Sequence, residues 1–335
     1  MTELLTAHIG GYPRIGEGKD HQRHRRALHH LQQKEISTHA FRDVEQSVLQ
    51  EIVREQLTSD VDEVTDGHVS WHDPISHFTR NVSGIRRGGL QRFFDTNTYY
   101  RVPVFYGKPK RKAYSVFNDF IFTQNHSYRT VRVVLTGPYT LARLSRSESR
   151  TFDSLKSRLS FFVDLIKSEI RALVRSSVKV IQIDEPAFPF YPEDIHLFHN
   201  AMQSILQICQ PARTVLHFSF SPLSPIYEHL LSLPVDILSL DFTYDGKKLI
   251  EKLQQTPPPM GIGFGLINGR NTRLEAIDPL IRLMKNWLEK TTVPITYLSP
   301  SCGLDYLPRP FAFEKLKLLS KIKEEINANK KVGTN

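Results

Sequence analysis

Cysteine is scarce in this chain, which has only two among its 335 residues. Two cysteines cannot build the disulfide framework of a small secreted domain, so the count predicts a reducing compartment. Residues 1–5 also lack the basic segment followed by an apolar segment that marks a signal peptide. We therefore expect a cytoplasmic protein.

Long apolar runs are absent as well. No segment approaches the roughly 20 consecutive apolar residues that span a bilayer, so the sequence predicts no membrane partner. Two basic runs, residues 23–26 and 108–112, lack the interleaved aromatic residues that stack on nucleic-acid bases. We interpret the first run as a solvated helix face and the second as a solvated loop, and we predict no nucleic-acid partner. The formal net charge of +9 favours an anionic substrate or an acidic protein partner.

Apolar runs separated by amphipathic segments are the dominant pattern, and 40% of the residues are hydrophobic. The pattern predicts eight strands alternating with helices, which is typical of a (β/α)8 TIM barrel. We expect residues 1–330 to form this single domain and residues 328–335 to be a frayed tail. The predicted strands are residues 4–9, 61–65, 131–135, 178–183, 214–218, 235–240, 260–267 and 293–298.

An excursion follows the second predicted strand. Residues 88–101 are long for a barrel loop and contain several aromatic side chains. Long loops of this kind are usually functional, so the segment and its Arg101 are candidates to cover a site. The alternative is a structural excursion that packs on its own aromatic residues.

The most informative strand is the apolar run 178–183, which ends at Asp184, Glu185 and Pro186. Such a run is typical of a strand buried on both faces, and proline stops it. The two acids would then lie at the carboxyl end of a buried strand, where α/β folds bind ligands. A helix N-cap followed by a turn is the alternative interpretation.

Other polar residues also come at or shortly after the ends of predicted strands. Random placement would scatter some of them onto the opposite rim, so their common position predicts one site at the carboxyl end of the barrel. The set comprises His68, Asp184, Glu185, His217, Asp241, Asn268 and Cys302.

Three of these residues, His217, Asp241 and Cys302, offer a nitrogen, an oxygen and a sulfur that suit zinc. Three protein ligands leave one position open, as catalytic zinc requires. A satisfied core histidine beside an inert thiol is the alternative. Ser219 could face the same side as His217, but serine is a poor zinc ligand. The second thiol, Cys209, falls on the apolar face of a predicted helix and is expected to be packed.

The sequence resembles the C-terminal catalytic barrel of cobalamin-independent methionine synthase, and especially the short single-barrel members of that family. The similarity extends from about Ile9 to Leu304, and it implies the barrel fold. The motifs that carry it are Ile9–Arg14, Thr65–Gly67, Asp95–Arg101, Leu135–Pro138, Ile181–Pro186 and Pro300–Leu304.

The resemblance implies a zinc ion that activates the thiol of homocysteine for attack on a methyl group. The family holds this ion with a His-x-Cys pair, a glutamate and a later cysteine. His217 and Cys302 match, Asp241 stands at the glutamate, and Ser219 stands at the first cysteine. Asp184 matches the aspartate that binds the amino group of the substrate.

Further positions depart from the family pattern. His68 replaces a glutamate, Asn268 replaces the catalytic histidine, and Leu144 lies where longer members carry a tryptophan against the pterin. We assign catalytic roles to Asp184, Glu185 and Asn268. Substrate binding is assigned to Gly10, Gly11, His68, Asp184, Tyr100 and Arg101.

These observations predict a zinc-dependent methyltransferase that acts on a small thiol, with methionine as the product that the resemblance implies. The resemblance also implies a methyl donor, which is either methylfolate or a methyl-corrinoid protein. An alkyl transferase to another thiol is one alternative. A barrel that has lost its chemistry and binds a ligand or a partner is another, because Ser219, Asp241, His68 and Asn268 all depart at one site.

Overall fold

The computed structural model describes residues 2–332, and its internal contacts divide the chain into two compact units. Unit 1 comprises the residues up to Ser70, Phe122–Val131 and the residues from Gly261 onward. Unit 2 comprises Trp71–Ile121 and Arg132–Met260. The prediction that residues 1–330 form a single domain stays a prediction.

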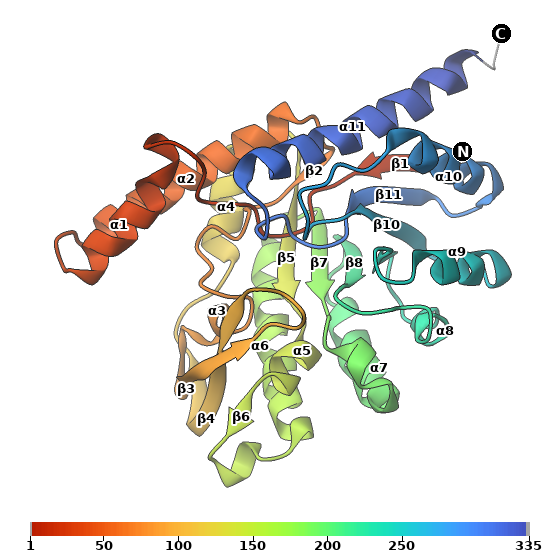
Figure 1. The fold of residues 1–335 in the computed structure, drawn as a ribbon. Coiled ribbons are helices and arrows are strands. Elements are labelled where there is room, and N and C mark those ends of the chain that lie inside the picture. The colour runs from red at the N-terminus through yellow and green to blue at the C-terminus, as the bar shows by residue number, and fades with distance from the viewer. Residues whose placement is uncertain (1, 333–335) are drawn as a thin grey trace. The chain divides into compact units, whose positions relative to one another are not determined.

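Eight parallel strands alternate with helices along the chain, which confirms the (β/α)8 barrel class (Figure 1). Each strand falls at or near its predicted segment. They are β1 (Glu3–Thr6), β2 (Glu63–Val64), β5 (Thr130–Thr136), β7 (Val180–Asp184), β8 (Arg213–Phe218), β9 (Ile237–Asp241), β10 (Gly261–Ile267) and β11 (Ile295–Pro300).

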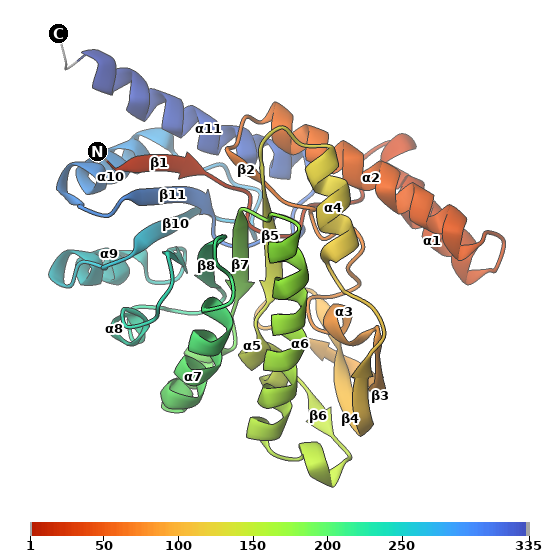
Figure 2. The ribbon, with the colours of Figure 1, turned by 180° about the vertical axis from the view of Figure 1, so that it is seen from behind.

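In unit 1, β11 lies between β1 and β10, and β2 pairs with the first residues of β5. The helix α11 (Arg309–Val332) packs on β1, β11 and α10 (Ile277–Lys290) (Figure 2). It extends into the tail that we expected at residues 328–335, and residues 333–335 lie outside the described residues.

The longest helix before β2 is α2 (Thr38–Thr58), which packs against α1 (Arg23–Gln32). Ser37 caps α2, because its side chain accepts a hydrogen bond from the Ala40 N–H. Val48, Ile52 and Val53 share one buried face, at the spacing typical of an amphipathic helix.

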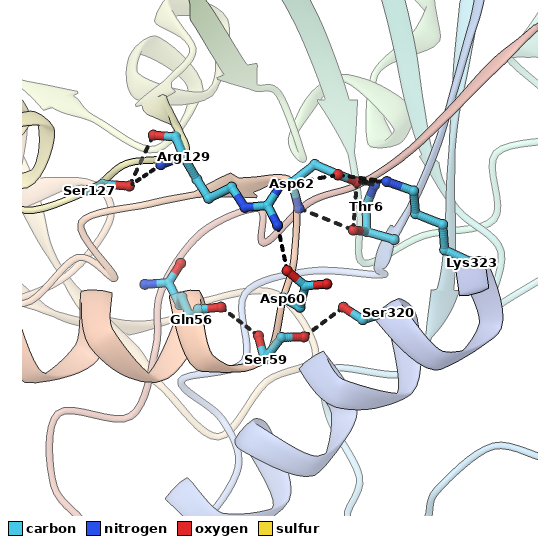
Figure 3. A network of polar contacts seen from close by, with 9 residues as sticks. All are labelled: Thr6, Gln56, Ser59, Asp60, Asp62, Ser127, Arg129, Ser320 and Lys323. Atoms are coloured by element: carbon cyan, nitrogen blue, oxygen red, sulfur yellow. Dashed lines mark hydrogen bonds and ion pairs between the residues drawn. The ribbon is translucent and has the colours of Figure 1, made fainter. Parts of the chain in front are cut away.

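A polar network in unit 1 joins β1, the segment before β2 and α11 (Figure 3). Asp62 Oδ2 accepts hydrogen bonds from the Thr6 N–H at 2.6 Å and the Thr6 hydroxyl at 2.9 Å. Lys323 Nζ lies 2.6 Å from Asp62 Oδ1, and Ser320 donates to the Ser59 carbonyl at 2.6 Å. These contacts fix β1 against the start of β2, so they also place the segments that follow both strands.

In unit 2, β5, β7, β8 and β9 pair in that order. Helices α6 (Leu155–Arg175) and α7 (Ile195–Leu206) follow β5 and β7, and the short α8 (Tyr227–Leu230) and α9 (Gly246–Gln255) follow β8 and β9. The register aligns Thr136 with Asp184 and Asp184 with His217. The strand ends therefore meet at one level, as the site prediction requires.

The excursion after β2 is a hairpin, so the prediction of loops at residues 88–101 and 108–112 is wrong. β3 (Val82–Arg92) and β4 (Tyr99–Arg111) pair antiparallel, and β6 (Arg146–Ser147) pairs with β4. Glycines and basic residues suggested loops. The pairing prevails because Val102 and Val104 bury their side chains while neighbouring backbone groups bond across the hairpin.

Short helices flank this hairpin. α3 (Ser76–Thr79) lies before it, and α4 (Phe117–Asn125) and α5 (Pro138–Arg143) follow it along the chain. Within residues 2–332, no helix is long and apolar enough to cross a bilayer.

Candidate active site

Three predicted site residues lie at consecutive strand ends in unit 2. Asp184 is the last residue of β7, His217 is the next-to-last residue of β8, and Asp241 is the last residue of β9. The exposed fraction is 2% for His217 and 0% for Asp241. Buried charged and polar groups need partners, and each of these residues has them.

His217 Nδ1 lies 3.0 Å from the Ser239 hydroxyl, its cross-strand register partner. If Nδ1 donates to this hydroxyl, the other ring nitrogen, Nε2, is the one that can bind a metal ion. Ser239 therefore orients the ring, and with Nδ1 as the donor it leaves Nε2 available to a metal ion.

The Asp241 carboxylate is held on both oxygens. Oδ1 accepts hydrogen bonds from the Thr243 N–H at 2.8 Å and the Thr243 hydroxyl at 2.6 Å. Oδ2 accepts a longer bond from the Phe220 N–H at 3.4 Å. A carboxylate oxygen has more than one lone pair, so this arrangement orients Asp241 and still permits metal binding.

Asp184 is connected to a buried arginine through Gln182. Arg132 donates to the Gln182 carbonyl oxygen at 2.8 Å, and the Gln182 amide donates to Asp184 Oδ1 at 2.7 Å. Burial raises the pKa of Asp184 to about 7, although the Gln182 hydrogen bond and the Arg132 charge oppose this rise. A cationic substrate group beside Asp184 would favour its ionised form.

Glu185 has the contacts of a structural anchor. Its carboxylate accepts hydrogen bonds from the N–H groups of Tyr139 at 3.0 Å and Thr140 at 2.8 Å, and from the Thr140 hydroxyl at 2.6 Å. Burial raises its pKa to about 8. These bonds join the end of β7 to the first turn of α5, so the geometry favours support of the site over the catalytic role that we assigned.

Gly137 allows this anchor to form, and its replacement by alanine is expected to destabilise the protein. A Cβ atom at Gly137 would lie 2.2 Å from the Glu185 carboxyl carbon. Relieving that overlap costs about 1–3 kcal/mol of unfolding free energy, measured by urea denaturation. Gly89→Ala is the matched control, because nothing lies within 4 Å of a Cβ atom there. Equal stability of the two variants would contradict the anchor.

The hairpin contributes two predicted substrate-binding residues with different environments. Tyr100 is 1% exposed, and burial raises the pKa of its hydroxyl to about 12. Arg101 is exposed, and its backbone N–H donates to Asp73 Oδ2 at 3.3 Å. Their roles in substrate binding stay predictions.

In unit 1, the segments after β1, β2 and β11 interlock. The Gly11 carbonyl accepts hydrogen bonds from the N–H groups of Leu304 at 2.7 Å and Asp305 at 3.1 Å. A Cβ atom on Gly11 would lie 2.6 Å from the Asp305 carboxylate, and one on Gly10 would lie 3.6 Å from the His68 ring. Glycine is needed at position 11 for this close approach. Gly10 and His68 are neighbours in the same cluster of segments, and their roles in substrate binding stay predictions.

His68 carries no charge at neutral pH. Its pKa is lowered to about 3, first by burial and then by the positive fields of His8 and Arg14. A neutral imidazole cannot replace a carboxylate as the partner of an ammonium group. This weakens the amine-binding role that the position has in the family resemblance.

In unit 1, the turn after β10, which contains Asn268, packs against the turn after β11, which contains Cys302. Cys302 is 2% exposed, and a Cβ atom on Gly269 would lie 2.8 Å from its sulfur. The Asn268 side chain accepts a hydrogen bond from the Arg270 N–H at 2.8 Å, so it shapes the turn after β10. This contact is structural, and the catalytic role assigned to Asn268 stays a prediction.

A group of possible ligand atoms that the sequence did not suggest occurs in unit 1, where atoms of His21, Glu51 and Glu55 lie within 4.8 Å of one another. Arg309 Nη2 lies 2.7 Å from Glu51 Oε1 and 2.9 Å from Glu55 Oε1. Arg23 also pairs with Glu51. Because the arginines balance these carboxylates, we interpret the group as an ion-pair network joining α2 to α11.

Sequence reasoning missed the residues that orient the site, namely Gln182, Ser239 and Thr243, and also Phe220. The alternation of side chains between the two faces of a strand could have indicated two of these residues. Gln182 and Ser239 each lie two residues before a predicted site acid, so they share its side of the strand. Thr243 and Phe220 lie in loops, where no periodic pattern indicates a contact.

Comparison with known proteins places the chain in a family. Residues 4–325 match the family model of the cobalamin-independent synthase, catalytic domain. The chain belongs to this family. The match spans nearly all of the chain, so the recognition made from sequence motifs is confirmed, as is the assignment to the methyltransferases of this family.

Curated relatives are of similar length. The methionine synthase of Sulfolobus acidocaldarius is 29% identical over 320 residues, which cover 94% of this chain and 90% of the relative. The methionine synthase of Sulfurisphaera tokodaii is 27% identical over 318 residues, with coverage of 93% and 89%.

Solved structures support the barrel fold. A B12-independent methionine synthase from Shewanella sp. W3-18-1, in complex with selenomethionine, has a TM-score of 0.79 at 17% identity, covering 97% of this chain and 98% of that chain. A putative vitamin-B12-independent methionine synthase from Listeria monocytogenes has a TM-score of 0.74, also at 17% identity, with coverage of 97% and 98%.

Proposed function

We propose that this protein transfers a methyl group to the thiol of homocysteine, giving methionine, with zinc bound by His217, Asp241 and Cys302. The observation that carries the proposal is the family match over residues 4–325, together with relatives that are methionine synthases. The donor set supports it, because imidazole nitrogen, carboxylate oxygen and thiolate sulfur are the ligands that zinc prefers.

The chain's own residues have distinct parts in the reaction. Ser239 and Thr243 orient His217 and Asp241, as described above. Asp184 would hold the amino group of homocysteine by a charge-assisted hydrogen bond and so place the sulfur next to the donor. Zinc bound at this site would lower the pKa of the acceptor thiol, which supplies thiolate at neutral pH.

The transfer itself is a displacement at carbon. A sulfur electron pair forms the new S–C bond while the methyl group leaves its donor, which keeps the electrons of the broken bond. The proton of the thiol is lost before this step. We propose a methylfolate or a methyl-corrinoid protein as the donor, since either carries a transferable methyl group.

Ser219 is the clearest departure from the family's zinc ligands, and Ser219→Cys is expected to strengthen zinc binding. A soft thiolate would replace a weak hydroxyl ligand, so the zinc dissociation constant should fall roughly tenfold or more. Competition with a chelator of known affinity measures this change.

Ser221→Cys serves as the matched control, because Ser221 is equally buried at 3% exposed but lies outside the ligand pattern. Unchanged affinity in Ser219→Cys, or an equal gain in both variants, would contradict the ligand assignment.

A second candidate function is alkyl transfer to a thiol other than homocysteine. The neutral state of His68 favours it, because a carboxylate that could bind an ammonium group is replaced by an uncharged ring. A panel of thiols with and without an α-amino group separates the two candidates. Preference for the amine-free thiols would favour the second.

A further inference from the structure

The turn of the β3–β4 hairpin packs on the loops that follow β7, β8 and β9. The Phe94 ring stacks on Phe190, after β7, with ring centroids 5.4 Å apart. It also stacks on Phe220, after β8, at 5.7 Å. The Tyr244 hydroxyl, after β9, donates to Asp95 Oδ2 at 2.5 Å. The hairpin turn therefore contacts the three loops nearest Asp184, His217 and Asp241.

Phe220 lies between the hairpin and the predicted metal ligand. Its ring contacts Phe94, and Phe93 meets the same ring edge-on at 5.7 Å. Its backbone N–H donates to Asp241 Oδ2 at 3.4 Å. Side chain and backbone of this one residue thus join the aromatic contact to the carboxylate.

The backbone of Phe220 is in an unusual conformation, with φ of 68°, and Phe94 also has a positive φ of 49°. Bulky residues rarely adopt this region, because the Cβ atom is crowded by the backbone. Such conformations persist only where surrounding contacts hold them. For Phe220, the stack with Phe94 on one side and the bond to Asp241 on the other are such contacts.

We propose that the hairpin turn positions Asp241 for metal binding, acting through Phe220, so that zinc affinity depends on the ring of Phe94. Phe94 and Phe220 are positioning residues in this account. The inference rests on the proposed function, because it takes Asp241 to be a zinc ligand.

The test is the zinc affinity of Phe94→Ala, measured by chelator competition with the purified full-length protein. Removing the ring takes away the face-on contact of Phe220 and leaves the edge-on contact with Phe93. We therefore expect zinc to bind roughly tenfold more weakly, as when a group that orients a ligand is lost. Phe94→Tyr keeps the stack and should restore the affinity.

Phe190→Ala is the matched control. It removes a ring of the same size that also stacks on Phe94, and Phe190 is 49% exposed. Its zinc affinity should stay within about twofold of the unaltered protein, since the Phe94–Phe220 contact remains. An equal loss in both variants would mean that the aromatic cluster supports the fold in general, and it would overturn the proposal.

A milder variant covers the case in which Phe94→Ala does not fold, as judged by circular dichroism. Tyr244→Phe removes only the hydroxyl that bonds Asp95, and it should weaken zinc binding a few-fold by loosening the same turn. Hydrogen exchange of the Phe220 amide in the metal-free protein should become faster in Phe94→Ala and Tyr244→Phe alike.

The outcomes separate this inference from the proposed function. If the unaltered protein binds zinc and Cys302→Ala does not, but Phe94→Ala binds it normally, only the positioning role fails. If the unaltered protein binds no zinc at all, the proposed function fails and the positioning role fails with it. Faster exchange at Phe220 without any change in zinc affinity would also overturn the positioning role.

Discussion

Replacing Cys302 by alanine is expected to remove zinc and methyl transfer together. Cys302 is the one sulfur donor in the proposed ligand set, and alanine would leave a nitrogen and an oxygen donor, which hold zinc far more weakly. Elemental mass spectrometry should find about one zinc per chain in the unaltered protein and almost none in the variant. Activity should fall to the background rate.

The second cysteine provides a matched control for this result. Cys209 is fully buried after α7, and its thiol donates to the Ile205 carbonyl at 3.5 Å. Burial raises its pKa to about 12, so it does not supply a thiolate. Cys209→Ala should lose some stability and keep its zinc. A Cys302→Ala variant with full zinc content and normal activity would exclude the proposed zinc mechanism.

Replacing Asp184 by asparagine is expected to lower kcat/KM for homocysteine by roughly 10- to 100-fold, because a hydrogen bond to a charged group contributes about 1.5–3 kcal/mol. Asparagine keeps the shape of Asp184 and can still accept from Gln182, but it lacks the negative charge that attracts the substrate amine. The loss should come mainly from KM. Steady-state kinetics of the two proteins measures it.

An acceptor without the amino group separates this role from general damage to the site. 4-Mercaptobutanoate has the same chain and carboxylate as homocysteine, so Asp184→Asn should transfer methyl to it about as well as the unaltered protein does. Equal losses with both acceptors would show that Asp184 supports the fold or the metal site and does not bind the amine.

The sequence predicts the barrel strands well because parallel strands are buried on both faces and appear as continuous apolar runs. The run before Asp184 is an example, and β7 ends at that residue. The β3–β4 hairpin was missed because it is only partly buried. Its strands carry many glycines and basic residues, which suggest a loop. The buried residues Val102 and Val104 support the pairing, but two apolar residues are too few to predict a strand among so many polar ones.

The candidate site is predicted only in its outline. Position at the end of a strand predicts His217, Asp241 and Asp184, because residues at the carboxyl ends of parallel strands gather at one rim. The groups that orient them are fixed by strand register and by loop conformation. Ser239 meets His217 because β8 and β9 pair in that register. The left-handed backbone of Phe220, which brings its N–H to Asp241, has no counterpart in the residue pattern.

The central claim is that the zinc ion binds the acceptor thiol, and zinc K-edge X-ray absorption tests it most directly. The protein would be loaded with zinc and measured before and after homocysteine is added, with no methyl donor present. We predict that the number of sulfur ligands rises from one, supplied by Cys302, to two. An unchanged sulfur count at saturating homocysteine would contradict thiol activation by zinc in this protein.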